Sequence, residues 1–235
     1  MSFFIRVTAQ SPGKRSSFRG CLNGGGRSLE WKKSLSEAIE AVRGGTRLPL
    51  LVFTSKGCEG SGKTMDEVLT NESVIAAIER ECVPVRIDAE ENREMAERFR
   101  VGWTPAFVVC DDEGNALERW EGYIPAEDFI PQLIIAKGLS AFHLGRHEEA
   151  VREFQMLVED YPGSELVPEA EYYLGAATFK LTGETNKLSE VCRDLIMTHP
   201  ESTWTKRCSL WGRDSNYLRP FVGYNGGGSA GSGAY

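Results

Sequence analysis

The sequence contains no apolar segment of about 18 residues, the length that a membrane-spanning helix needs. It has six cysteines and three histidines but no Cys-x-x-Cys pair and no Cys/His cluster with zinc-binding spacing. Positive charge is in the minority, with 27 Lys and Arg against 34 Asp and Glu and a net charge of −7. We therefore expect no membrane span, no metal or other cofactor, and no nucleic-acid partner held by general charge.

The remaining composition is that of an ordinary globular protein, with 41% hydrophobic and 26% charged residues. A length of 235 residues allows one large domain or two small ones. The amino-terminal segment lacks the pattern of a signal peptide, because charge follows a very short apolar run. Together with the scattered cysteines, this predicts a reducing, cytoplasmic location.

Both ends of the chain differ from its middle. Residues 1–30 are rich in Gly, Ser and Arg, with five basic side chains against one acidic, and indicate a flexible arm. Residues 212–235 form a Gly/Ser-rich tail in which Tyr217, Phe221 and Tyr224 are expected to anchor a partner.

Residues 31–137 alternate between helical and strand patterns, which predicts an α/β domain with a mixed sheet. We expect the sheet to be parallel where helices intervene and antiparallel at the Asp111–Asn115 hairpin. The predicted strands are Leu50–Phe53, Val83–Ile87, Pro105–Cys110 and Leu117–Trp120. The predicted helices are Ser28–Arg43, one leading from the Gly-rich turn through Leu69, one capped by Asn71 or Ser73, and Glu90–Arg100.

Residues 138–211 have only helical patterns. Gly138 and Gly175 lead two similar units, in which small residues, aromatics and a closing proline follow the spacing of a 34-residue helical-hairpin repeat. The segment resembles tetratricopeptide (TPR) repeats, with Ser202–Trp211 as a cap helix. The resemblance implies a protein partner. Eight acidic residues lie between positions 145 and 171. They would select a basic partner if they line the concave groove of the repeats, and would only make the protein more soluble if they face outward.

The loop after the first predicted strand matches two motifs. Gly57–Thr64 fits G-x-x-x-x-G-K-[ST], the phosphate-binding P-loop with Lys63 on the phosphates, and lies between a strand and a helix. The same residues also fit a second pattern, in which a strand is followed by a cysteine, Cys58, at the start of a helix, with Ser61 three positions later. Val101-Gly-Trp-Thr-Pro105 follows, and then a strand and an acidic hairpin.

The second pattern resembles the thioredoxin family over about residues 31–137. The resemblance implies a thioredoxin fold, a cis peptide bond before Pro105, and client binding by Gly57, Trp103, Thr104 and Pro105. The chain departs from the family at three positions: Gly57 replaces a tryptophan, Ser61 the resolving cysteine, and Val52 a buried aspartate. A dithiol cycle is therefore unavailable at this site.

The site residues predicted for chemistry are Cys58, as a thiolate favoured by the helix start, and Ser61. Lys63 would favour the thiolate and Glu59 would oppose it. Three functions remain open: a monothiol redox or client-binding protein, a non-catalytic adaptor on a degenerate thioredoxin fold, and, remotely, a nucleotide binder. We interpret Cys82, Cys110, Cys192 and Cys208 as packing residues.

Overall fold

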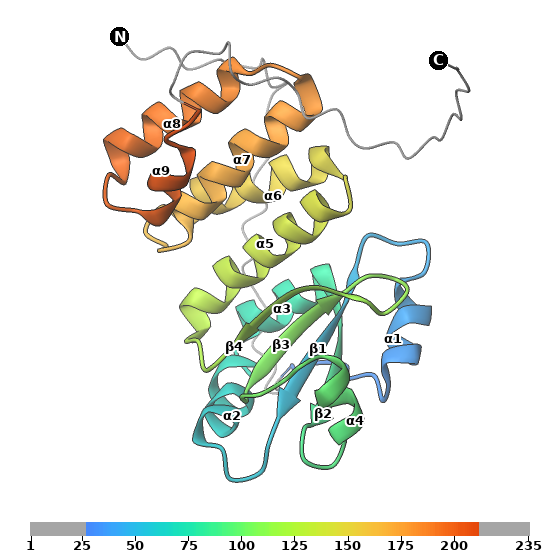
Figure 1. The fold of residues 1–235 in the computed structure, drawn as a ribbon. Coiled ribbons are helices and arrows are strands. Elements are labelled where there is room, and N and C mark those ends of the chain that lie inside the picture. The colour runs from blue at the N-terminus through green and yellow to red at the C-terminus, as the bar shows by residue number, and fades with distance from the viewer. Residues whose placement is uncertain (1–26, 212–235) are drawn as a thin grey trace, which may run out of the picture.

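The computed structural model describes residues 27–211 and shows a four-stranded sheet with helices on both faces, followed by a stack of helices (Figure 1). The strands are β1 (Leu48–Thr54), β2 (Cys82–Asp88), β3 (Ala106–Cys110) and β4 (Ala116–Glu121). The helices among them are α1 (Leu35–Val42), α2 (Glu59–Lys63), the π-helical turn η1 (Thr64–Val68), α3 (Glu72–Glu81) and α4 (Arg93–Arg98). The carboxyl-terminal helices are α5 (Ala126–His143), α6 (His147–Asp160), α7 (Val167–Thr182), α8 (Asn186–Thr198) and α9 (Thr203–Cys208). The predicted order of helices and strands is confirmed. Most of the predicted arm and all of the tail, with its aromatic residues, lie outside the described residues.

The sheet is mixed and has the order β2-β1-β3-β4. Strand β1 is parallel to β2, whereas β1 and β3, and β3 and β4, are antiparallel. The expectation that strands separated by a helix run parallel is therefore wrong for β3. Helix α4 lies at the carboxyl end of β1 and β2. Strand β3 begins at that same end, because Thr104, just before β3, has its hydroxyl 2.6 Å from that of Ser55, just after β1.

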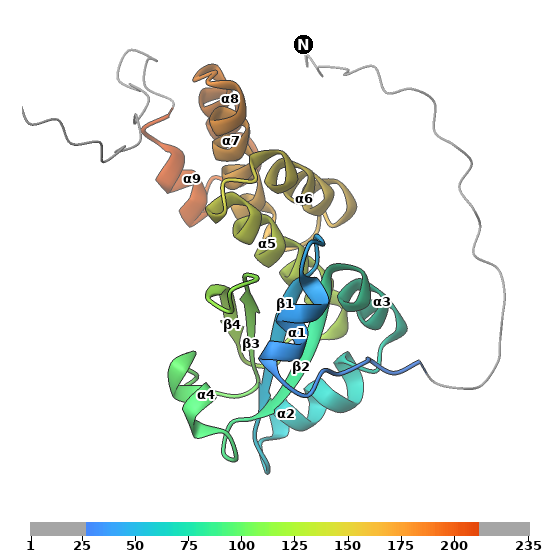
Figure 2. The ribbon, with the colours of Figure 1, turned by 90° about the vertical axis from the view of Figure 1, so that its right-hand side faces the viewer.

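Strand β1 is buried on both faces, as its apolar run predicts. Leu50 and Val52 pack against α3 and α5, and Leu51 and Phe53 pack against α1 and α4. The alternation follows from the two-residue period of a strand, which sends successive side chains to opposite faces. Figure 2 shows the resulting three layers, with the sheet between its two layers of helices.

The first helix is shorter than the pattern from Ser28 predicts. Ser34 caps α1 by accepting a hydrogen bond from the Glu37 backbone N–H, so the helix begins at Leu35. The preceding residues instead run beside β2, where the Lys32 backbone N–H donates to the Pro84 carbonyl at 2.9 Å. Pairing with an exposed sheet edge satisfies backbone groups that a longer helix would have satisfied internally. The helix predicted over 90–100 is likewise limited to α4, which Asn92 caps.

Helix α5 belongs to two cores. Phe129 and Leu133 pack against the sheet, whereas Ile135 and Leu139 pack against α6. The helix runs without interruption across residues 137 and 138, where the sequence suggests a domain boundary. The sheet and the helical stack are therefore joined by one rigid element and not by a linker.

A buried cation holds this junction together. Lys137 on α5 is 8% exposed, and its ammonium group pairs with Glu81 on α3 and, at 2.9 Å, with Glu153 on α6. Glu149 lies 3.9 Å from the same nitrogen. Burial alone would lower the pKa of Lys137, but its hydrogen bonds to the carboxylates of Glu81 and Glu153 raise that pKa above its ordinary value.

Helices α5 to α8 pack against one another in chain order, with a glycine where α5 meets α6 and another where α7 meets α8. A Cβ on Gly138 would lie 2.6 Å from the Phe154 ring, and one on Gly175 would lie 2.9 Å from Val191. Helix α9 closes the stack through Cys208, which is fully buried beside α8. The segment is helical as predicted, and none of the helices within residues 27–211 has the length and apolarity to cross a membrane.

Replacing Lys137 with methionine should destabilise the protein by roughly 3–5 kcal/mol, because it leaves buried carboxylates without their cation. Urea unfolding at neutral pH measures the change. Lys56→Met is the matched control, since Lys56 pairs with Glu91 in an exposed position, and its loss should matter little. Equal effects of the two substitutions would contradict the assignment of the junction to Lys137.

Candidate functional site

Cys58 lies where β1 delivers the chain to a helix. Strand β1 ends at Thr54, and Cys58 is the N-cap of α2, which continues directly into η1. Gly57, at φ +76°, makes the turn that the intervening loop needs. The Cys58 sulfur accepts a hydrogen bond from the Ser61 backbone N–H at 3.4 Å, so the thiol takes the capping role usually held by an oxygen.

The Thr104–Pro105 segment lies against the thiol. Its peptide bond is cis, as expected, and the Cys58 thiol donates a hydrogen bond to the Thr104 carbonyl at 3.2 Å. Gly60 permits this close approach, because a Cβ there would lie 3.1 Å from Cδ of Pro105. The tertiary structure thus brings together Cys58 and Thr104, which are 46 residues apart in the sequence.

The surroundings of Cys58 lower the pKa of its thiol below the ordinary value. The largest cause is hydrogen bonding by the Ser61 side chain, followed by the Ser61 backbone N–H and the Thr104 side chain, while burial opposes them. Lys63 is not among these causes: its ammonium group lies 2.9 Å from the Glu59 carboxylate. Lys63 and Glu59, which were predicted to act on the Cys58 thiolate in opposite directions, therefore pair with each other instead.

Ser61 and Val52 occupy the positions at which the thioredoxin family has a resolving cysteine and a buried aspartate. Ser61 is 3% exposed, and its hydroxyl accepts a hydrogen bond from the Ser55 backbone N–H at 3.3 Å. Val52 is fully buried in the apolar layer between the sheet and helices α3 and α5. The site therefore has one thiol, a buried hydroxyl where a resolving thiol would stand, and no carboxylate at position 52.

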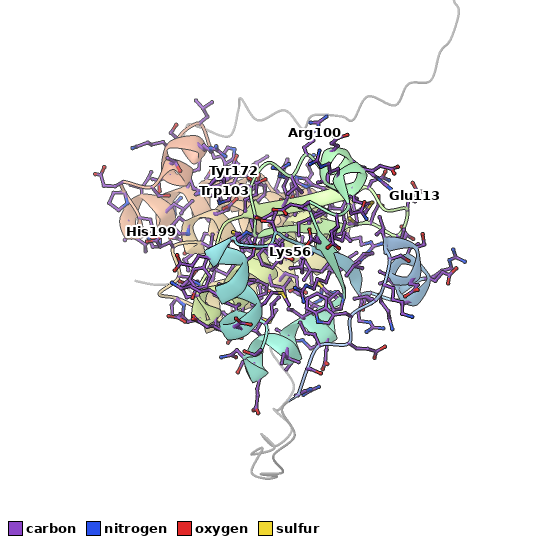
Figure 3. The ribbon with its side chains drawn as sticks, turned by 90° about the horizontal axis from the view of Figure 1, so that it is seen from below. Lys56, Arg100, Trp103, Glu113, Tyr172 and His199 are labelled. Atoms are coloured by element: carbon purple, nitrogen blue, oxygen red, sulfur yellow. The ribbon has the colours of Figure 1, made fainter. Side chains whose placement is uncertain are left out.

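Two aromatic side chains are exposed near the thiol. Trp103 precedes Thr104 and is 68% exposed; it is labelled in Figure 3. Tyr123 is 38% exposed, and its Cβ would lie 3.7 Å from a Cβ at Gly60. Sequence reasoning missed Tyr123, which reaches the site because the Gly122 backbone N–H donates to the Pro105 carbonyl at 2.8 Å.

Residues 35–136 match the family model described as a thioredoxin-like domain. This part of the chain is a thioredoxin-like domain. The solved structures similar to this chain include a DsbH oxidoreductase, 18% identical, covering 53% of this chain and 94% of its own, with a TM-score of 0.43. A thioredoxin from Thermus thermophilus is 26% identical, covers 52% of this chain and 97% of its own, and has a TM-score of 0.43. No curated protein matches the sequence.

The P-loop motif of the thioredoxin-like domain does not form a phosphate cradle. Residues 59–63 are already helical, and the Gly62 backbone N–H donates to the Cys58 carbonyl at 3.0 Å within that helix. Thr64, the residue that would contact a metal ion, is 1% exposed. With its backbone donors committed and Lys63 paired to Glu59, the motif lacks the open loop that phosphate binding requires.

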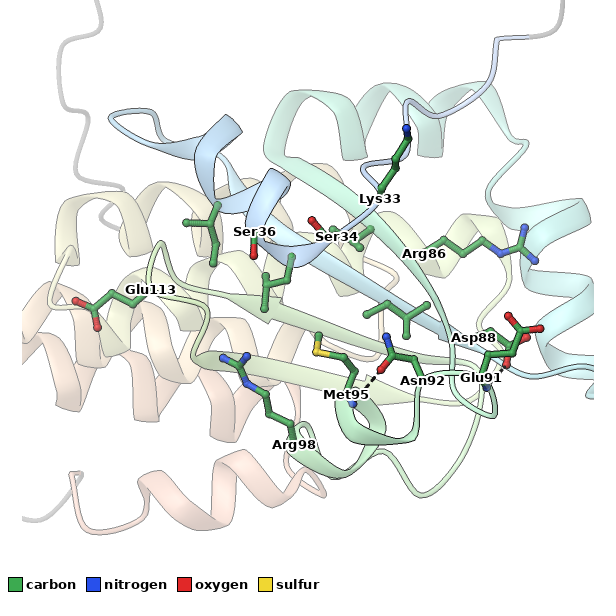
Figure 4. A pocket seen from close by; sticks show the side chains of 14 residues that line it. Lys33, Ser34, Ser36, Arg86, Asp88, Glu91, Asn92, Met95, Arg98 and Glu113 are labelled. Carbon is green, nitrogen blue, oxygen red and sulfur yellow. Dashed lines mark hydrogen bonds between the residues drawn. The ribbon is translucent and has the colours of Figure 1, made fainter.

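A cleft of about 630 Å³ lies elsewhere on the domain, between α1, β2 and α4 (Figure 4). Its polar groups serve the fold: Asp88 accepts hydrogen bonds from the Glu90 and Glu91 backbone N–H groups, and Arg98 donates to the Gly114 carbonyl. None of the residues predicted for the functional site lines this cleft.

The other described cysteines are packing residues, as predicted. Cys82, Cys110, Cys192 and Cys208 are buried, and burial raises the pKa of Cys82 and of Cys110 to about 12. Asp111 accepts hydrogen bonds from the Glu113 and Asn115 backbone N–H groups, which confirms its role in the hairpin turn.

Alkylation should be selective for Cys58 among the described cysteines and should follow a pKa lower than that of an ordinary cysteine thiol. The rate of reaction with iodoacetamide, measured against pH, reports this pKa; a Cys21→Ser background removes the cysteine outside the described residues. Ser61→Ala should raise the pKa and slow the reaction at neutral pH several-fold, since it removes the largest stabilising contact of the thiolate. An unchanged profile would show that Ser61 does not hold the thiolate.

Proposed function

We propose that this protein acts in thiol-based redox chemistry or client binding through the single thiol of Cys58. The observation that carries the proposal is the position of the Cys58 sulfur, between the Ser61 backbone N–H and the Thr104 carbonyl. The Ser61 backbone N–H favours a thiolate, and the half-buried Thr104 carbonyl, which accepts from the neutral thiol, lies beside it where a client backbone could approach. Gly57, Trp103, Thr104 and Pro105 are proposed to contact the client.

The proposed step is one thiol–disulfide exchange. The Cys58 thiolate attacks one sulfur of a client disulfide or of oxidised glutathione, forming a new S–S bond as the old one breaks. The second sulfur leaves as a thiolate and takes a proton from water. Because Ser61 cannot resolve the mixed disulfide, release requires a second thiol, such as reduced glutathione, to attack the Cys58 sulfur and regenerate its thiolate.

We propose that the carboxyl-terminal helices are TPR-like hairpins that bind a protein partner. The close approaches of Gly138 to Phe154 and of Gly175 to Val191 support this, since such repeats place small residues where their helices touch. A cytoplasmic location suits the chemistry, because glutathione there keeps thiols reduced.

The alternative is a non-catalytic adaptor. Ser61 and Val52 favour it, because both replace groups on which a dithiol oxidoreductase depends. An adaptor would bind its partners equally well with serine at position 58. The two functions therefore differ in their dependence on one sulfur atom.

Capture of partners with and without reductant separates the two functions. In the Cys21→Ser background, monothiol exchange predicts that the full-length protein takes up one glutathionyl group from oxidised glutathione, detected by intact mass, and that adding Cys58→Ser abolishes this uptake. Captured partners should then be released by reductant and absent from the Cys58→Ser sample. Partners retained by both proteins under both conditions would favour the adaptor.

Ser61→Cys should create a dithiol site. Because the Ser61 backbone nitrogen already lies 3.4 Å from the Cys58 sulfur, a thiol at position 61 is placed to attack a mixed disulfide. The variant should reduce insulin disulfides with dithiothreitol as the reductant, whereas the natural protein and Cys58→Ser/Ser61→Cys should show only background turbidity. Activity of that double variant equal to that of Ser61→Cys would contradict attack by Cys58.

A further inference from the structure

Aromatic rings gather where the helical stack meets strand β4. Strand β4 packs against α5, and α9 packs against α7. The Phe142 and Tyr173 rings lie 5.5 Å apart, and the Tyr173 and Trp204 rings 5.4 Å apart. The Tyr172 ring lies 5.1 Å from Trp204 and stacks on Trp211 at 4.4 Å. These half-buried rings come from α5, α7, α9 and the turn that follows α9, so only the folded stack brings them together.

Two carboxylates border the rings. Burial raises the pKa of Glu118 on β4 to about 7, and burial together with the charge of Glu118 raises that of Glu169 on α7. Within residues 27–211, neither carboxylate forms an ion pair with a lysine or arginine; Glu118 lies 3.0 Å from Nδ1 of His143. Burial makes these carboxylates costly to ionise, and a cation bound beside them would offset that cost and favour their charged form.

The protein already places one cation on these rings. The Arg207 guanidinium lies 4.2 Å from the centre of the Trp204 ring. Glu169 lies four residues before Tyr173 on α7, which puts the two side chains on one face of that helix, and the Tyr173 ring lies next to Trp204. The surface thus suits a guanidinium or ammonium group by both its aromatic faces and its carboxylates.

Six other acids of the segment 145–171 do not lie beside these aromatic rings. Glu149 and Glu153 are taken up by Lys137, while Glu148, Glu159, Asp160 and Glu165 are exposed. Most of the acids predicted to select a partner are therefore neutralised or solvated. Glu169 differs from these six acids because it is half-buried and lies on the face of α7 that carries Tyr173.

We propose that the surface formed by Glu118, Phe142, Glu169, Tyr172, Tyr173 and Trp204 binds a peptide segment of a partner protein through an arginine or lysine side chain. This inference rests on the proposed partner-binding function of the helices and names its partner class. Charge complementarity carries it: two half-buried carboxylates flank rings that already bind a guanidinium. Because Glu118 belongs to the thioredoxin-like domain, the bound segment contacts both parts of the protein.

Fluorescence anisotropy with a labelled arginine-containing peptide tests the proposal on the full-length protein. The same peptide with citrulline in place of arginine is the control, since citrulline keeps the shape of the side chain and removes its charge. The arginine peptide should bind more tightly, and Glu169→Gln or Glu118→Gln should weaken it about tenfold. Glu148→Gln, a change at an exposed acid on α6, should leave the affinity unchanged.

Arg207→Gln should tighten binding several-fold, because it removes the internal cation that competes for Trp204. A purely structural role of Arg207 would not produce this gain. Equal binding of the arginine and citrulline peptides, or equal losses from Glu148→Gln and Glu169→Gln, would overturn the proposal. Binding that appears only after removal of residues 212–235 or 1–26 would assign the surface to the chain's own segment, and would also overturn it.

Cys58→Ser keeps this inference separate from the proposed thiol chemistry. The variant should bind the arginine peptide with unchanged affinity, because Cys58 is not part of the surface. If Cys58 is glutathionylated but the peptide does not bind, the proposal that this surface binds a partner is wrong and the proposed thiol chemistry stands. Peptide binding without glutathionylation would keep that assignment and favour the adaptor function.

Discussion

The fold depends on the burial of helix α5, in which residues 133–141 are all buried. The first half of the helix completes the apolar layer beneath the sheet, and its second half forms the first wall of the helical stack. A lysine in such a helix is costly unless its charge is matched. Glu81 and Glu153 match the charge of Lys137 from opposite sides of the junction, so one ion cluster joins the two parts of the protein.

The thiol site keeps the backbone arrangement expected of a thioredoxin-like domain but has neither a second cysteine at position 61 nor a carboxylate at position 52. The helix start, the Thr104 carbonyl and the close approach of Gly60 to Pro105 are all present around Cys58. Ser61 is buried and hydrogen-bonded, so the fold accommodates a hydroxyl in the position of a second thiol. A site of this kind can form a mixed disulfide but needs an external thiol to release it.

Several features of the sequence predicted the fold because they are local. The apolar run of β1, the cap at Asn71 and the hairpin at Asp111 depend on near neighbours along the chain. The start of α1 and the direction of β3 were predicted wrongly, because each depends on a distant partner. Lys32 pairs with β2 instead of joining a helix, and β3 begins beside Ser55.

Residue identities alone establish that Cys58 follows a predicted buried strand and that position 61 holds serine in place of a resolving cysteine. Folding shows that residues 59–63 of the Gly57–Thr64 motif are helical, that Tyr123 reaches the site, and which acids Lys137 neutralises. Folding also brings Glu118 of β4 to within 3.0 Å of His143 on α5 and puts Glu169 on the face of α7 that carries Tyr173. The physical reason is that covalent chemistry follows from residue identity, whereas hydrogen bonding, burial and charge pairing depend on groups that only folding brings together.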